Sequence, residues 1–175
     1  MKKGPSEVRF EFDHMLVKLG KYLRILGYDA AWEPGIRTHE LIHRANREGR
    51  VFVTRNRQIR EQYPPAREAV VLAEDDPVEQ LRALGRALDL DLHSGLFSKC
   101  IRCNVPLDAV PDKAAVRARV HPNVFDRYDR FFTCPACGTV FWHGSHVRNT
   151  CRKLGVPLPE EGERPTSTAE RPTPK

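Results

Sequence analysis

The chain has 175 residues, of which 40% are hydrophobic and 30% charged, which suits one packed domain with a small appendage. No apolar run approaches the roughly 20 residues that span a bilayer, and no secretory signal is recognisable, so we expect a cytoplasmic protein without a membrane partner. The net charge of +6 favours a polyanionic partner, with nucleic acid first, although a solvated basic surface explains it equally well.

The first half of the chain alternates between strand and helix patterns. Residues 8–12, VRFEF, carry apolar side chains at every second position, which predicts a half-buried strand. The pattern then changes to a helical period that ends at Gly27, and residues 28–32, YDAAW, give a weaker second strand. The apolar stripe of this helix is Met15, Leu19, Tyr22, Leu23 and Leu26.

A second helix is predicted over residues 39–48, HELIHRANRE, with Thr38 as its N-cap and Gly49 at its end. Residues 51–54, VFVT, predict a buried third strand, and AVVLA from Ala69 predicts a fourth. Strands that alternate with helices in this way indicate an α/β fold, in which helices flank a parallel sheet.

The last helix of this half has the clearest start. Asp76 suits its N-cap, Pro77 its first position, and Glu79 is placed to complete a capping box. In parallel sheets, ligands bind beyond the carboxyl ends of the strands. The residues at those ends are therefore the candidates for a site: Asp13 after the first strand, Arg55 and Asn56 after the third, and Asp75 and Asp76 after the fourth.

Two Cys-x-x-Cys pairs occur in the second half, Cys100 with Cys103 and Cys134 with Cys137. Two such pairs place four thiolates around one zinc ion, which is the arrangement of a zinc ribbon. A closed site of four thiolates leaves no open position for catalysis, so we expect a structural zinc. Cys151 is left over and is expected to be a packed thiol.

The patterns divide the chain into an α/β domain over residues 1–92, a zinc ribbon over 93–155 and a tail over 156–175. The tail is mostly Pro, Glu, Thr and Arg, and we expect it to be disordered because it can bury too little apolar surface. His143 and His146, next to the ribbon, are interpreted as packing or surface residues, with RNA contact or zinc ligation as alternatives.

Five motifs stand in order along the chain: FDHMLVKLGKYLRILGYD, EGRVFVTRNRQI, DDPVEQLRAL, CIRCNVPL and CPACGTVFWHGSH. With these motifs the chain resembles the Mut-seven C-terminal ribonuclease family from about Val8 to Cys151. The resemblance implies that residues 1–92 form a PIN-like nuclease domain in front of the zinc ribbon. It also implies that water activated on Mg²⁺ or Mn²⁺ cuts RNA, with carboxylates from separate strand ends holding the ions.

The resemblance assigns Asp13 to the first acidic position of that catalytic site. Asn56 stands where the family usually reads Thr-Arg-Asp, and Thr38 stands where another Asp commonly begins the second helix. Glu40 is close to Thr38, and Asp75 follows the fourth strand, so both are kept as catalytic candidates. Because two formal negative charges are lost, we expect metal affinity to fall severely and RNA cleavage to be weakened or lost.

Basic residues near this site suit the phosphates of RNA. Arg55 and Arg57 flank Asn56, and a guanidinium fork matches phosphate oxygens in bidentate fashion. Lys18 and Arg24 on the first helix form a phosphate-facing stripe in one interpretation and the solvated side of the helix in the other. Aromatic residues between 128 and 142 similarly suit either base stacking or the small core of the ribbon.

Three hypotheses follow from these residues. The chain is a metal-dependent ribonuclease centred on Asp13, a non-catalytic module that binds RNA or a ribonucleoprotein, or an adaptor that binds other proteins. The resemblance favours the first hypothesis, whereas Thr38 and Asn56 favour the second.

Overall fold

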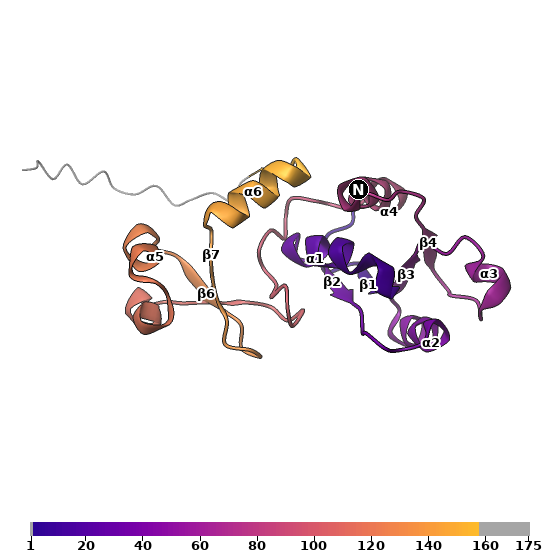
Figure 1. Ribbon diagram of the computed structural model, residues 1–175, viewed down its shortest axis with the longest axis horizontal. Helices are drawn as coiled ribbons and strands as arrows, with labels where there is room; N and C mark the ends of the chain where they lie inside the picture. The colour runs from indigo at the N-terminus through magenta and orange to yellow at the C-terminus, as the bar shows by residue number, and fades with distance from the viewer. Residues whose placement is uncertain (1, 158–175) are drawn as a thin grey trace, which may run out of the picture.

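The computed structural model describes residues 2–157, and its first half is built on a four-stranded parallel sheet in the order β2-β1-β3-β4 (Figure 1). The strands are β1 Arg9–Phe12, β2 Asp29–Ala31, β3 Val51–Thr54 and β4 Ala69–Val71. The prediction of an α/β fold with a parallel sheet is confirmed. All four carboxyl ends lie at one edge of the sheet, because neighbouring strands run in the same direction.

Helices cover both faces of this sheet (Figure 1). A short 3-10 turn, η1 His14–Leu16, leads into α1 Val17–Ile25, which packs with α4 Pro77–Leu88 on one face. Helix α2 Thr38–Glu48 packs on the other face, and the short α3 Ile59–Gln62 follows β3.

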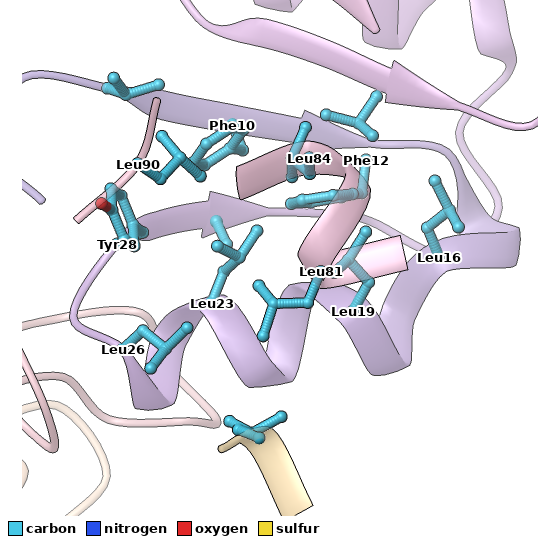
Figure 2. Close-up of a cluster of buried hydrophobic side chains, with 14 of the residues drawn as sticks. Phe10, Phe12, Leu16, Leu19, Leu23, Leu26, Tyr28, Leu81, Leu84 and Leu90 are labelled. Carbon is cyan, nitrogen blue, oxygen red and sulfur yellow. The ribbon is translucent and has the colours of Figure 1, made fainter. Parts of the chain in front are cut away.

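The main core lies between the sheet and helices α1 and α4 (Figure 2). The core side chains occupy every second position of β1 and recur at helical spacing on α1 and α4. The apolar pattern of the sequence therefore matches the faces that are buried. The stripe predicted for the first helix is correct except at Met15, whose side chain is 64% exposed because η1 turns it out of the core. The labelled core residues include Phe10, Phe12, Leu19, Leu23, Leu81 and Leu84.

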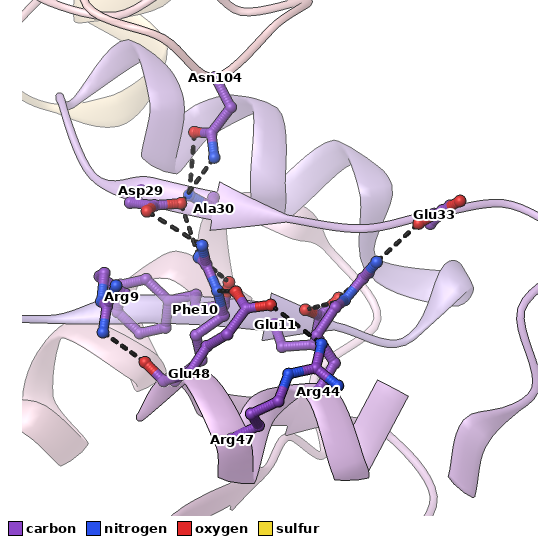
Figure 3. Close-up of polar contacts among 11 residues, drawn as sticks. Arg9, Phe10, Glu11, Asp29, Ala30, Glu33, Arg44, Arg47, Glu48 and Asn104 are labelled. Carbon is purple, nitrogen blue, oxygen red and sulfur yellow. Dashed lines mark hydrogen bonds and ion pairs between the residues drawn. The ribbon is translucent and has the colours of Figure 1, made fainter. Parts of the chain in front are cut away.

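The opposite face of the sheet carries ion pairs around the buried Glu11 (Figure 3) and, beside them, a small apolar cluster. Glu11 of β1 is fully buried and accepts two bonds from Arg44 of α2, at 2.9 and 2.8 Å. Asp29 of β2 pairs with Arg50 at 2.6 Å. A buried carboxylate needs such a partner, because desolvation without compensation costs several kcal/mol.

Two helix starts differ in detail from the predictions. Helix α2 has Arg37 as its N-cap and Thr38 as its first residue, so the prediction of Thr38 as the cap is wrong. The carboxylate of Glu40 accepts the N–H of Arg37 at 3.1 Å and closes this start. Asp76 caps α4 as predicted, but the carboxylate of Glu79 pairs with Arg82 on the next turn.

The second half forms a three-stranded antiparallel sheet of β5 Asp108–Ala109, β6 Phe131–Thr133 and β7 Val140–Trp142. Two short helical segments, η2 Lys113–Arg119 and α5 Pro122–Arg127, lie between β5 and β6.

The last helix, α6 Ser145–Leu154, returns to the first half of the chain (Figure 1). Cys151, Leu154 and Val156 are buried in the main core beside α1 and α4. Cys151 is therefore a packed thiol, and burial raises its pKa. The division at residue 92 stays a prediction, but the first domain takes part of its core from beyond it. Of the predicted tail, residues 158–175 lie outside the described residues.

Across residues 2–157, no helix combines the length and the apolar character that a membrane crossing requires.

Candidate functional site

The carboxyl edge of the sheet presents Asp13 directly after β1. Its side chain is almost fully buried, and its Oδ2 accepts the hydroxyl of Thr54, at the end of β3, at 2.9 Å. The other oxygen, Oδ1, lies 3.1 Å from Nδ1 of His14 and accepts no hydrogen bond within the described residues. One carboxylate oxygen of Asp13 thus holds the side chain in place, and the lone pairs of the other oxygen accept no hydrogen bond from the described residues.

Asn56 takes part in the local turn after β3. Its N–H donates to the hydroxyl of Thr54 at 3.0 Å, and its side-chain carbonyl accepts the N–H of Gln58 at 2.9 Å. Its amide nitrogen donates to Gln62 on α3 at 3.0 Å. The carbonyl oxygen that a hard cation would need is therefore engaged in an Asx turn.

The acidic residues after β4 have partners of their own. Asp75 is highly exposed and forms an ion pair with Arg55. Asp76 accepts the N–H groups of Val78 and Glu79 at the start of α4. These bonds hold the pKa of Asp76 below its ordinary value. The ion pair of Asp75 and the capping role of Asp76 explain the positions of both carboxylates without a bound metal ion.

Asp13, Glu40 and Asp75 form no cluster of metal-binding side chains within the described residues. Among the described residues, only the four cysteines of the ribbon bring three or more metal-binding side chains together. Glu40 serves the start of α2, Asp75 pairs with Arg55, and Asn56 closes a turn, whereas Asp13 keeps one oxygen that accepts no hydrogen bond from the described residues. Magnesium prefers several hard oxygen ligands in near-octahedral geometry, so this donor set does not fit a firmly held ion.

The basic candidates occupy different environments. Lys18 and Arg57 are exposed, as phosphate contacts would require. Arg24 is only 5% exposed, and its guanidinium lies 3.5 Å from the ring centre of Trp32. Burial lowers the pKa of Arg24 to about 10. The prediction that Arg24 faces phosphate does not fit this position.

The guanidinium of Arg24 joins the two halves of the chain. It donates to the carbonyl of Ala30 in β2 at 2.8 Å and to the carbonyls of Ile101 and Arg102, in the first Cys-x-x-Cys turn, at 3.0 and 2.8 Å. The sequence does not reveal this role, because the helical period cannot show which distant segment covers a basic residue.

The four cysteines of the ribbon form a site that fits zinc. The ligand atoms of Cys100, Cys103, Cys134 and Cys137 all lie within 4.8 Å of one another. The sulfurs of Cys100 and Cys137 are 3.9 Å apart, and tetrahedral zinc with bonds of about 2.3 Å places its sulfurs about 3.8 Å apart. The cluster therefore has the residue types and the spacing of a four-thiolate zinc site.

The two Cys-x-x-Cys turns share one backbone pattern. The N–H of Cys100 donates to Val105 at 2.8 Å, and the N–H of Cys134 donates to Thr139 at 3.0 Å. The residue after each pair has a left-handed backbone, with φ of 63° at Asn104 and 71° at Gly138. Glycine, and next asparagine, adopts this conformation most readily, so both turns have suitable residues.

Protonation within the cluster is uneven. The hydroxyl and N–H of Thr139 lower the pKa of Cys137 to about 6, whereas hydrogen bonding to Cys137 raises the pKa of Cys103. The lowered pKa favours the thiolate form of Cys137, and zinc needs all four sulfurs in that form.

Asn104 also attaches the first of these turns to the edge of the large sheet (Figure 3). Its side-chain oxygen accepts the N–H of Ala30 in β2 at 3.1 Å, and its amide nitrogen donates to Asp29 at 2.6 Å. Together with Arg24, it satisfies both backbone groups of Ala30 on this edge. The only sequence signal was an asparagine at a position that favours glycine.

Positive charge is concentrated in the second half. Residues 93–157 contain ten Lys and Arg against four Asp and Glu, a net charge of +6, whereas residues 1–92 contain sixteen against fifteen. Several arginines of the first half are already paired with carboxylates, among them Arg44, Arg50 and Arg55. The ribbon and α6 therefore carry the charge that would attract a polyanion.

Comparison with known families supports the resemblance seen in the sequence. The model of the family described as Mut7-C RNAse domain matches residues 8–154, which include the sheet, the ribbon and α6. No curated protein matches the chain significantly, and no solved structure does.

Proposed function

The chain belongs to the Mut7-C RNAse domain family, and from this premise we propose that it binds RNA while holding its catalytic divalent ion weakly or not at all. The observation that carries the proposal is that Glu40, Asn56 and Asp75 are each engaged with another partner, so that Asp13 is the one candidate with an oxygen left for a cation. The four-cysteine site supports a second part of the proposal, a structural zinc that organises the ribbon.

The charge distribution supports RNA as the partner. A net charge of +6 over residues 93–157 matches a phosphate backbone, and most of these basic side chains are exposed. Arg57 and Lys18 add exposed positive charge at the carboxyl edge of the large sheet.

Asp13 also supports a second candidate function, residual RNA cleavage. Its Oδ1 is buried and accepts no hydrogen bond from the described residues, so one ligand position remains for a cation. One carboxylate supplies too few ligands for tight binding, so this activity would require a high concentration of Mg²⁺ or Mn²⁺.

RNA binding is tested by measuring the affinity of the full chain for structured RNA at increasing salt. Each neutralised phosphate contributes about one unit to the slope of log affinity against log salt, so several contacts lower the affinity by orders of magnitude between about 50 and 200 mM. Affinity that is negligible and independent of salt would favour the adaptor.

Cleavage is tested with the same RNA in Mg²⁺ or Mn²⁺. We expect little cleavage by the natural chain and more by the double variant Thr38→Asp, Asn56→Asp, which restores the two acidic positions that the family resemblance implies. If the natural chain cleaves RNA efficiently and Asp13→Asn abolishes this cleavage, the proposal is contradicted and the chain is a metal-dependent ribonuclease.

A further inference from the structure

A cavity of about 250 Å³ lies between the zinc ribbon, the end of α1 and α6. Its lining is almost entirely apolar and includes Ile25 of α1, Phe132 and Trp142 of the ribbon sheet, and Thr150 of α6. The rings of Phe132 and His143 stack at this wall, with centroids 5.5 Å apart and planes 27° from parallel. The cavity thus offers flat aromatic surfaces within the most basic part of the chain.

Basic side chains continue from this cavity along α1 and α6. Lys18, Tyr22 and Ile25 are spaced by four and three residues, so they share one face of α1. Thr150 and Lys153 are neighbours on α6, and the ammonium of Lys153 lies 6.0 Å from the ring centre of Tyr22. The two helices therefore present lysines on the path that begins at the cavity.

The other end of this path is the carboxyl edge of the large sheet. Asp76, the cap of α4, lies at that edge; the N–H groups of Val78 and Glu79 chiefly lower its pKa, and the positive charges of Lys153 and Lys18 add to that effect. Helix α1 itself begins four residues after Asp13 and rises about 10 Å from Lys18 to Ile25. The cavity and the Asp13 edge thus lie at opposite ends of one short basic track.

We propose that this cavity receives one unpaired base of an RNA strand, and that Lys153 and Lys18 hold the adjoining phosphates and direct the strand toward Asp13. The inference rests on the proposed function and names the part of the RNA that the site reads. Aromatic faces suit a base because every base stacks on them, and the lysines along α1 and α6 favour a polyanion over an uncharged apolar peptide.

The test compares two single strands of about eight nucleotides, one intact and one of the same length without bases, bound to the zinc-loaded full chain. Phosphate contacts are the same in both, so the comparison isolates the bases. We expect the strand without bases to bind about tenfold more weakly, as stacking of one base requires.

Variants on α6 locate the effect. Thr150→Trp adds a ring to the wall of the cavity, and Asn149→Trp adds the same ring at an exposed neighbour outside the lining. We expect Thr150→Trp to bind the intact strand about tenfold more weakly, with unchanged affinity for the strand without bases, and Asn149→Trp to bind both as the natural chain does.

The outcomes separate the inference from the proposed function. Equal affinity of the natural chain for the two strands would overturn the base site while leaving RNA binding in place, and so would equal behaviour of the two variants. If neither strand binds, RNA binding itself is wrong and the base site falls with it. Should Thr150→Trp fail to fold, the two strands on the natural chain still decide the matter.

Discussion

The contact between Asn104 and the edge of the large sheet gives a quantitative prediction. The variant Asn104→Gly keeps the left-handed backbone of the Cys-x-x-Cys turn and removes only the side chain. Two hydrogen bonds are lost, one to the carboxylate of Asp29 and one from the buried N–H of Ala30.

The expected cost follows from these two bonds. A hydrogen bond to a charged group contributes about 1.5–3 kcal/mol, and a buried N–H left without a partner costs about 1–3 kcal/mol. Asp29 keeps its pair with Arg50, and water can reach part of this edge, so we expect a total loss of about 2–4 kcal/mol in the free energy of unfolding.

The assay is urea unfolding of the zinc-loaded chain, combined with amide hydrogen exchange at Ala30. Gly138→Ala is the matched control, because it strains the equivalent residue of the second turn, by about 1–2 kcal/mol, without touching the sheet. A loss below about 0.5 kcal/mol for Asn104→Gly, with unchanged exchange at Ala30, would refute the reasoning, because surface substitutions have effects of that size.

Three further predictions concern single groups. Thr54→Val should lower the free energy of unfolding by about 1–3 kcal/mol, because the buried carboxylate of Asp13 loses its hydrogen-bond donor. Thermal unfolding checks this prediction, with Thr54→Ser, which keeps the hydroxyl, as the control. Burial disfavours the charged form of Asp29, but hydrogen bonds from Arg50 and Asn104 outweigh burial and lower the pKa of this carboxylate. The charged carboxylate therefore stabilises the fold fully above its ordinary pKa, and this stabilisation is lost as the pH falls through the lowered pKa. Asp29→Asn should therefore flatten the stability profile below about pH 4, and an unchanged profile would exclude this ion pair as its source. Cys100→Ser or a chelator should unfold the ribbon and release one zinc ion per chain, whereas a folded ribbon without zinc would contradict a structural metal.

The sequence predicted the large sheet well because its signals are local. Alternation in β1, the apolar run of β3 and the Asp76-Pro77 start of α4 each reflect packing or capping within a few residues. The same applies to the cysteine cluster, whose spacing within each pair comes from one tight turn.

The errors arose where distant segments decide the environment. Arg24 looked like an exposed helix residue, but the first Cys-x-x-Cys turn covers it, and Met15 looked apolar and buried until η1 turned it outward. Asn56 illustrates a different limit. The sequence shows that an amide stands where the family usually has an Asp, but it does not show that the side-chain carbonyl accepts a hydrogen bond from the N–H of Gln58. Long-range packing and the choice among hydrogen-bond partners do not follow from periodicity.

The most direct test of the central claim is manganese binding, measured by the paramagnetic resonance of free Mn²⁺ with zinc kept in the ribbon. The natural chain should retain almost no Mn²⁺, and Thr38→Asp with Asn56→Asp should retain one ion that Asp13→Asn removes. Tight retention of one ion by the natural chain, lost on Asp13→Asn, would show that Asp13 already has the ligands it needs and would contradict the account.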